Sequence, residues 1–101
     1  MRNAYQAPAG ENIFMIRRTD VTYGQLDKLL LSLGFKCRIV DLDGDARVYK
    51  HDERPGATLI LPAYPKRDKM LDYHLVAVRT ILDLNGIVEA EDFAGKFKKL
   101  A

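Results

Sequence analysis

The most informative segment is TYGQLDKLLLSLGFKCRIVDLDGDARVYKH, residues 22–51, in which the hydrophobic period changes once from helical to alternating. Its first half carries leucines at helical spacing, which form one apolar stripe: Leu26, Leu29, Leu30 and Leu33. Thr22 stands three residues before Gln25, the capping-box spacing that begins a helix. Gly34 can adopt the left-handed conformation that ends one. We therefore predict a helix between Thr22 and Gly34.

The second half of the segment predicts a β-hairpin. The residues after Gly34 alternate as in a half-buried strand. Phe35, Cys37 and Ile39 alternate with Lys36, Arg38 and Val40. The pair Asp43-Gly44 favours a tight turn that returns the chain to His51. The prolyl-glycyl turn at residues 52–56 then leads to the apolar run ATLILP, residues 57–62. This run indicates a third strand, which is either the best buried of the three or covered on both faces.

The flanking segments complete an α+β fold. The apolar stripe Leu71, Leu75, Val78 and Leu82 predicts a second helix that begins near Lys69 or Met70 and ends at Gly86. The order is α-β-β-β-α, a three-stranded antiparallel sheet with two helices on one face. We divide the chain into an N-terminal arm or short strand (1–20), the folded domain (21–93) and a basic C-terminal tail (94–101) that frays beyond Phe93.

Composition narrows the function classes. The chain has 101 residues, of which 48% are hydrophobic and 30% charged, as in one small globular domain. A net charge of +2 does not by itself indicate a nucleic-acid binder, so the placement of charges matters. The single cysteine, Cys37, and an N-terminus without the apolar run of a signal peptide favour a cytoplasmic location. No segment is long and apolar enough to predict a membrane span.

Four patches in this order resemble the HicA, or YcfA-like, toxins. The patches are TYGQLDKLLLSLGF (22–35), GDARVYKH (44–51), LPAY (61–64) and VRTILDLNGI (78–87). HicA toxins are small bacterial mRNA interferases of toxin-antitoxin pairs, with a double-stranded-RNA-binding-domain (dsRBD) fold and metal-free chemistry. The resemblance therefore implies RNA as a partner, a HicB-like antitoxin as a second one, and no cofactor.

The resemblance also implies that catalysis is impaired. The family's reactive histidine aligns with Ala46, and two further family histidines align with Arg47 and Tyr64. Metal-free cleavage of a phosphodiester requires a group that titrates near neutral pH, which imidazole supplies and a methyl group does not. His51 is the remaining catalytic candidate, as a displaced general base or a metal ligand. The alternative is a solvated histidine at the end of a strand.

Basic residues on the predicted strands and before the last helix suggest how RNA would bind. Lys36 and Arg38 share one parity on their strand and Arg47, Tyr49 and His51 another on the next, so these five could line one sheet face. The run KRDK, residues 66–69, is expected at the N-terminus of the last helix, where it could contact phosphates. The candidate RNA-binding residues are Lys36, Arg38, Arg47, Tyr49, Lys66, Arg67 and Lys69. The alternative is an ordinary solvated surface.

The remaining motifs have structural explanations as well as functional ones. His74 is expected to pack beside the apolar stripe, and zinc is not expected because neither histidine has further ligands at metal spacing. The acidic hairpin DLDGD, residues 41–45, fits a turn better than a calcium loop. The run IFMIRR, residues 13–18, could pair with a second copy of the chain to form a homodimer, or pack within its own chain. The alternative to an RNA-binding protein is thus a protein-interaction module.

Overall fold

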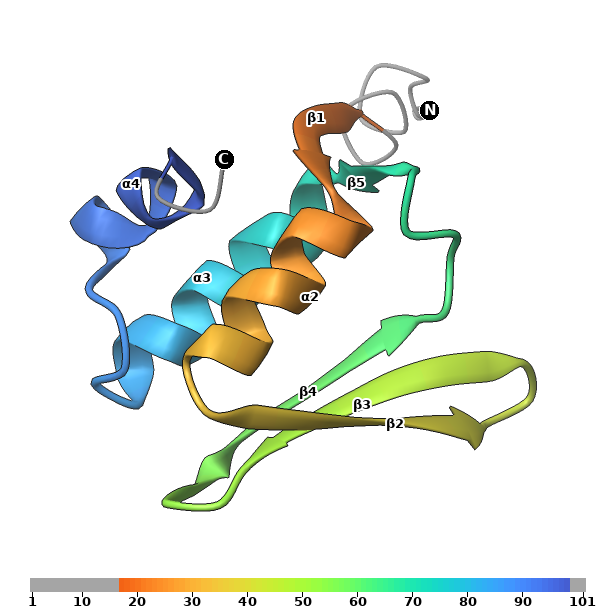
Figure 1. The fold of residues 1–101 in the computed structure, drawn as a ribbon, viewed down its shortest axis with the longest axis horizontal. Helices are drawn as coiled ribbons and strands as arrows, with labels where there is room; N and C mark the ends of the chain where they lie inside the picture. The colour runs from red at the N-terminus through yellow and green to blue at the C-terminus, as the bar shows by residue number, and fades with distance from the viewer. Residues whose placement is uncertain (1–16, 99–101) are drawn as a thin grey trace, which may run out of the picture.

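The computed structural model describes residues 17–98, which form an α+β fold around one three-stranded antiparallel sheet (Figure 1). The strands are β2 (Phe35–Asp41), β3 (Asp45–His51) and β4 (Arg54–Pro62), in the order β2-β3-β4. The helices α2 (Tyr23–Ser32) and α3 (Asp72–Leu84) both lie on the same face of this sheet. The predicted α-β-β-β-α fold class is confirmed.

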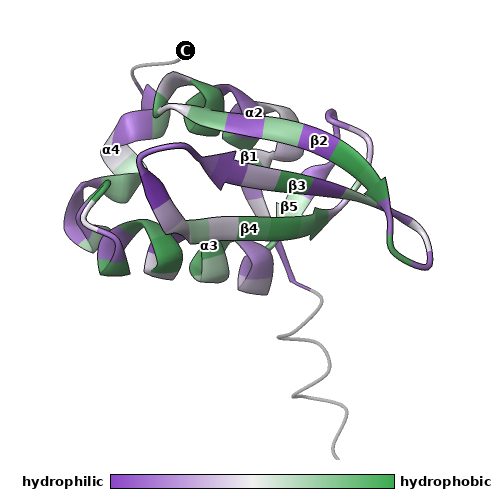
Figure 2. Cartoon of the chain, turned by 90° about the horizontal axis from the view of Figure 1, so that it is seen from below, coloured by the Kyte–Doolittle hydropathy of each residue, from purple (hydrophilic) through white to green (hydrophobic). Residues whose placement is uncertain are grey.

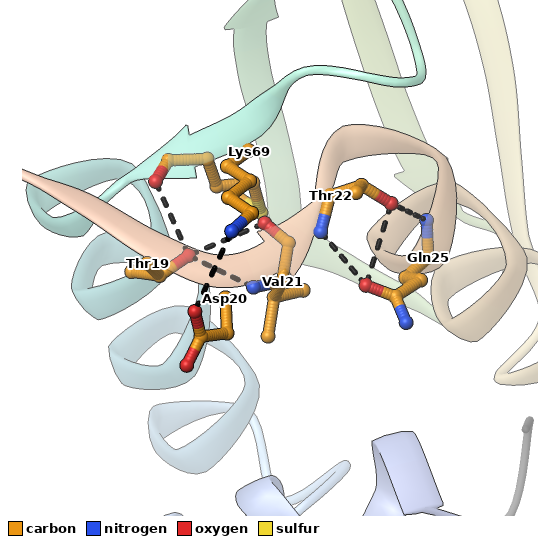
Figure 3. Close-up of polar contacts among 7 residues, drawn as sticks. Thr19, Asp20, Val21, Thr22, Gln25 and Lys69 are labelled. Carbon is orange, nitrogen blue, oxygen red and sulfur yellow. Dashed lines mark hydrogen bonds and ion pairs between the residues drawn. The ribbon is translucent and has the colours of Figure 1, made fainter.

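The start of α2 is held by the capping box that the sequence predicts (Figure 3). The Thr22 hydroxyl accepts a hydrogen bond from the Gln25 backbone N–H at 3.1 Å, and the Gln25 side-chain oxygen accepts one from the Thr22 N–H at 2.8 Å. Two backbone donors that a helix leaves unpaired at its N-terminus are thereby satisfied. The cap fixes where α2 begins and hence where its leucine stripe faces the sheet.

Replacing Thr22 by alanine is expected to lower the free energy of unfolding by about 1 kcal/mol, because the hydroxyl that accepts from Gln25 is lost. Urea unfolding measures the change. Thr80→Ala is the control, since Thr80 is an exposed residue inside α3 whose hydroxyl only bonds the Val76 carbonyl of its own helix. Equal losses in the two variants would contradict a specific role of the cap.

β3 is the central strand and its register fixes which side chains share a face. Tyr49 of β3 lies opposite Cys37 of β2 and Leu59 of β4, and directly opposed residues point to the same side. This inner face packs on the helices. Asp43 and Gly44 both have positive φ in the hairpin between β2 and β3, as the Asp-Gly turn requires.

The core lies between the helices and the inner sheet face. Its largest fully buried side chains come from both helices, β3 and the segment before α3: Tyr49, Leu26, Leu30, Met70, Leu82 and Val78. The predicted leucine stripe of α2 is thus confirmed as a core stripe. β4 is covered on one face only, because Leu59 and Leu61 are buried while Ile60 is exposed. Figure 2 views the sheet from its opposite, outer face, with the helices behind it.

The second predicted helix begins later than the sequence suggests. Residues Lys69–Leu71 form a short strand, β5, which pairs with β1 (Arg18–Thr22), and α3 begins only at Asp72. The extended form is favoured here because the Leu71 N–H donates to the Tyr23 hydroxyl and the Asp72 N–H donates to the Arg17 carbonyl. The predicted start near Lys69 is therefore wrong, and KRDK does not form a helix N-terminus.

The two chain ends differ from the predictions in different ways. Of the run IFMIRR, residues 13–16 lie outside the described residues, and Arg18 belongs to β1, which pairs within the chain. Beyond Phe93 the sequence predicts fraying, but the structure continues as α4 (Phe93–Lys98) after a short 3-10 turn, η1 (Ala90–Asp92). Phe93 is buried and packs edge-to-face on Phe97 at a centroid distance of 5.2 Å, which anchors this helix. Within residues 17–98, no helix has the length and apolar character to cross a membrane.

Candidate nucleic-acid interface

The register separates the five residues that were expected to line one sheet face. Opposed pairs are Lys36 with Lys50 and Cys37 with Tyr49, so Lys36 and Arg38 lie on the outer face while Arg47, Tyr49 and His51 lie on the inner face. The prediction of a single shared face is wrong. The prediction used only the alternation of side chains within each strand. Which residues of the two strands share a face is set by the three-residue loop that joins Asp41 to Asp45.

The outer face gathers a different set of cations, which we call the outer cation cluster: Lys36, Arg38 and Lys50. Their side chains border a shallow hollow of about 200 Å³ together with Val48 and Asp52. Lys36 and Lys50 are directly opposed, a placement of like charges that disfavours the free sheet. Lys50 was missed in the sequence because it is out of phase with Arg47 and Tyr49. Its opposition to Lys36 follows once the loop length is known.

One carboxylate lies beside the outer cation cluster. The Lys36 ammonium contacts Asp52 at 2.9 Å, and this hydrogen bond, with the attraction between the charges, raises the pKa of Lys36. Both side chains are exposed, so the pair is screened by solvent and contributes little to folding. Within the described residues, Arg38 and Lys50 form no ion pair, and their charges face solvent.

Tyr49 is a core residue and cannot stack on a base. It is 2% exposed, and its hydroxyl donates to Asp27 Oδ1 at 2.8 Å. Burial and this hydrogen bond to Asp27 strongly raise the pKa of Tyr49. Lys66 reaches the other oxygen of the same carboxylate at 3.3 Å. Two residues predicted to contact RNA therefore belong to one structural network.

His51 holds the end of α2 and is not a free acid or base. Its Nε2–H donates to the Leu33 carbonyl at 2.9 Å, and its Nδ1 accepts the Glu53 N–H at 3.2 Å. Its ring also packs edge-to-face on Phe35. Because both ring nitrogens are occupied by backbone groups, His51 has no lone pair or proton for substrate in this arrangement. Ala46 is buried and lies between its cross-strand neighbours Val40 and Pro62.

The other predicted contacts are spread around the loop before β5. Lys69 forms an ion pair with Asp20 (Figure 3), at a distance of 3.7 Å, and Arg67 is exposed. Arg47 is half-buried and donates to the Tyr64 carbonyl at 2.7 Å. The run KRDK is therefore not one cation cluster, because Lys66 and Lys69 face different carboxylates. Within residues 17–98, no group of histidine, cysteine and acidic residues could hold a metal ion.

A second feature, which the sequence did not indicate, is a group of rings that we call the aromatic cluster: Tyr23, Tyr64, Tyr73 and His74. His74 lies in its middle, 4.4 Å from Tyr73, 6.0 Å from Tyr23 and 6.3 Å from Tyr64 between ring centroids. Tyr23 and Tyr64 meet edge-to-face at 5.4 Å. The predicted packing of His74 is confirmed by its 8% exposure. The grouping could not be anticipated because its members come from α2, α3 and the loop after β4.

No family model, curated protein or solved structure matches this chain. The function must therefore be argued from the molecule's own surfaces.

Two surfaces carry side chains of the kinds that bind nucleic acids. The outer cation cluster presents positive charge without aromatic rings, which suits phosphate groups. The aromatic cluster presents two partly exposed tyrosines, which suit a planar ligand.

Proposed function

We propose that this protein is an RNA-binding domain of the HicA-like toxin-antitoxin type, a catalytically impaired mRNA interferase that holds the RNA backbone on its outer sheet face. The observation that carries the proposal is the outer cation cluster, in which the β2–β3 register brings Lys36, Arg38 and Lys50 onto one face. The opposite face of the sheet packs on α2 and α3. A phosphate backbone on the outer face would relieve the repulsion between the opposed lysines.

The geometry of the three cations suits consecutive phosphates of one strand. Lys36 and Arg38 are two residues apart on β2, about 6.6 Å along the strand, and Lys50 is about 5 Å across on β3. Arginine can bind a phosphate with two parallel hydrogen bonds, whereas lysine acts as a point charge. The three side chains can therefore act on neighbouring phosphates at the same time.

Impaired catalysis is supported by what occupies the histidine positions. Ala46 carries no titrating group, and the two nitrogens of His51 are bonded to backbone atoms. A ribonuclease that works without metal needs a general base within hydrogen-bond reach of the 2′-hydroxyl. The proposal therefore includes binding without cleavage.

Replacing Lys36, Arg38 and Lys50 together by alanine is expected to weaken RNA binding about tenfold or more at low salt. The salt dependence should also become shallower, by about 2 to 3 in the slope of log affinity against log salt, because three phosphate contacts are lost. The measurement is fluorescence anisotropy of a labelled RNA at several salt concentrations. Denaturing gels of the same samples should show intact RNA.

The matched control removes three cations from elsewhere on the surface: Lys28 on α2, Arg79 on α3 and Lys98 on α4. Both triple variants lower the formal charge of +2 by the same three units. Equal losses in the two would contradict a specific site on the outer face.

A wild-type protein that binds no RNA at low salt would contradict the proposal as a whole. It would favour the second candidate function, a protein-interaction module that binds a HicB-like antitoxin or a second copy of itself. The observation behind that alternative is an open apolar hollow of about 520 Å³ beside the β2–β3 hairpin. Leu42 and Ile60, which are 52% and 59% exposed, line it.

A further inference from the structure

In the aromatic cluster the central histidine is buried, whereas the two outer tyrosines are partly exposed. Tyr64 and Tyr73 are 38% and 46% exposed, while His74 is 8% exposed. Tyr64 follows β4 and Tyr73 lies in the first turn of α3, so the two rings approach His74 from different segments. The core does not require their exposed faces, since Tyr23 already closes the cluster on the buried side at 2% exposure.

The hydrogen bonds of Tyr23 fix the tautomer of His74. The Tyr23 oxygen accepts the Leu71 N–H at 3.2 Å and lies 2.8 Å from His74 Nδ1. The Tyr23 hydroxyl is buried and has no other acceptor within residues 17–98, so its proton is satisfied by donation to Nδ1. The ring proton then resides on Nε2, for which the described part of the chain provides no acceptor.

His74 stays neutral at physiological pH. Burial lowers the pKa of His74, and the positive charge of Arg18 lowers it further. A protonated ring would also leave the buried Tyr23 hydroxyl proton without its acceptor, because Nδ1 could then only donate. The cluster therefore offers a fixed, uncharged N–H donor between two partly exposed rings.

Two arginines lie beside the aromatic cluster. Arg47 is anchored on the Tyr64 carbonyl at 2.7 Å, and Arg18 on the Lys69 carbonyl at 2.7 Å, next to the strand that leads into α3. Burial raises the pKa of Tyr23, and the positive charge of Arg18 partly opposes that rise, which places this charge close to the rings. A ligand with a planar ring and flanking anionic groups complements this combination of tyrosines and arginines.

We propose that the aromatic cluster binds one unpaired base of single-stranded RNA. The base stacks on the exposed rings of Tyr64 and Tyr73 and accepts a hydrogen bond from His74 Nε2–H, while Arg47 and Arg18 contact the flanking phosphates. This inference rests on the proposed function and specifies its substrate. Bases paired in a duplex cannot present a face to the tyrosines, so single strands are the preferred ligand.

The first experiment measures anisotropy with one labelled RNA sequence, as a single strand and annealed to its complement. The double variant Tyr64→Ala and Tyr73→Ala should bind the single strand at least about fivefold more weakly, since the base loses both rings on which it stacks. The double variant Tyr64→Phe and Tyr73→Phe should bind like the wild type, because the ring faces remain. Both tyrosines are partly exposed, and circular dichroism shows whether the variants stay folded.

The second experiment follows the ring signals of the two histidines by NMR during titration with the single strand. His74 signals should shift while those of His51 stay in place. His51 bonds to Leu33 at the C-terminal end of α2 and His74 to Tyr23 at its N-terminal end, about 15 Å away along the helix. His51 is therefore a control within the same molecule.

The outcomes separate this inference from the proposed function. If RNA binding depends on the outer cation cluster but is unchanged in the tyrosine-to-alanine variant, with His74 signals static, the base site is overturned and RNA binding stands. If the duplex binds more tightly than the single strand, the base site is likewise overturned. If binding depends on the tyrosines and not on the outer cluster, the base site stands and the outer face loses its role. If the wild type binds no RNA, both proposals fail.

Discussion

Tyr49→Ala is expected to lower the free energy of unfolding by about 4 kcal/mol or more, enough to unfold a marginally stable domain of this size. Tyr49 is among the largest fully buried side chains, on the central strand of the sheet, so its removal leaves a cavity under both helices. The change also deprives the buried carboxylate of Asp27 of the hydroxyl at 2.8 Å. Urea unfolding followed by far-UV circular dichroism measures the loss.

Tyr49→Phe separates the two contributions, because it keeps the ring and removes only the hydroxyl. It should cost about 1.5 to 3 kcal/mol, the range for hydrogen bonds to a charged group. Lys66→Ala should cost far less, since the Lys66 side chain is 60% exposed and water can replace it. A Tyr49→Phe variant as stable as the wild type would show that Asp27 does not depend on the tyrosine.

The elements that the sequence predicts correctly are those set by local signals. Thr22, Gln25 and Gly34 define α2 through contacts within a few residues, and Asp43-Gly44 defines the hairpin through its own backbone conformation. β5 and α4 could not be predicted in this way. β5 forms because it pairs with β1, which is distant in the sequence. α4 forms because Phe93 packs in the hydrophobic core.

The candidate surfaces show the same division between local and non-local information. Lys36 and Arg38 are recognisable from alternation within one strand, and both lie on the outer face as a pair. That Lys50 joins them on the outer face, while Tyr49 does not, depends on the register between β2 and β3. A change of one residue in the length of the connecting loop would exchange the two faces. The aromatic cluster depends on tertiary packing alone, since Tyr23 and His74 are 51 residues apart.

Gly34→Ala is expected to lower the free energy of unfolding by about 2 to 3 kcal/mol, although the substitution adds only a methyl group. Gly34 has φ of +97°, a conformation that side chains strain to adopt. A Cβ at this position would also lie 3.0 Å from His51 Nε2, the atom that donates to the Leu33 carbonyl at the end of α2. The imidazole must therefore shift by a few tenths of an ångström, which strains that hydrogen bond.

Gly86→Ala provides the matched control, because Gly86 also has positive φ, +69°, but a Cβ there would meet nothing within 4 Å. Its cost should be about 1 to 2 kcal/mol, from the backbone alone. The excess at Gly34 then comes from His51 and from its φ of +97°, which lies further outside the left-handed region than the φ of Gly86, and a double-mutant cycle isolates the part due to His51. In a His51→Ala background the ring is absent, so Gly34→Ala should cost less than it does in the wild-type protein. An unchanged cost in that background would place the whole effect in the backbone and leave His51 without a role at the helix end.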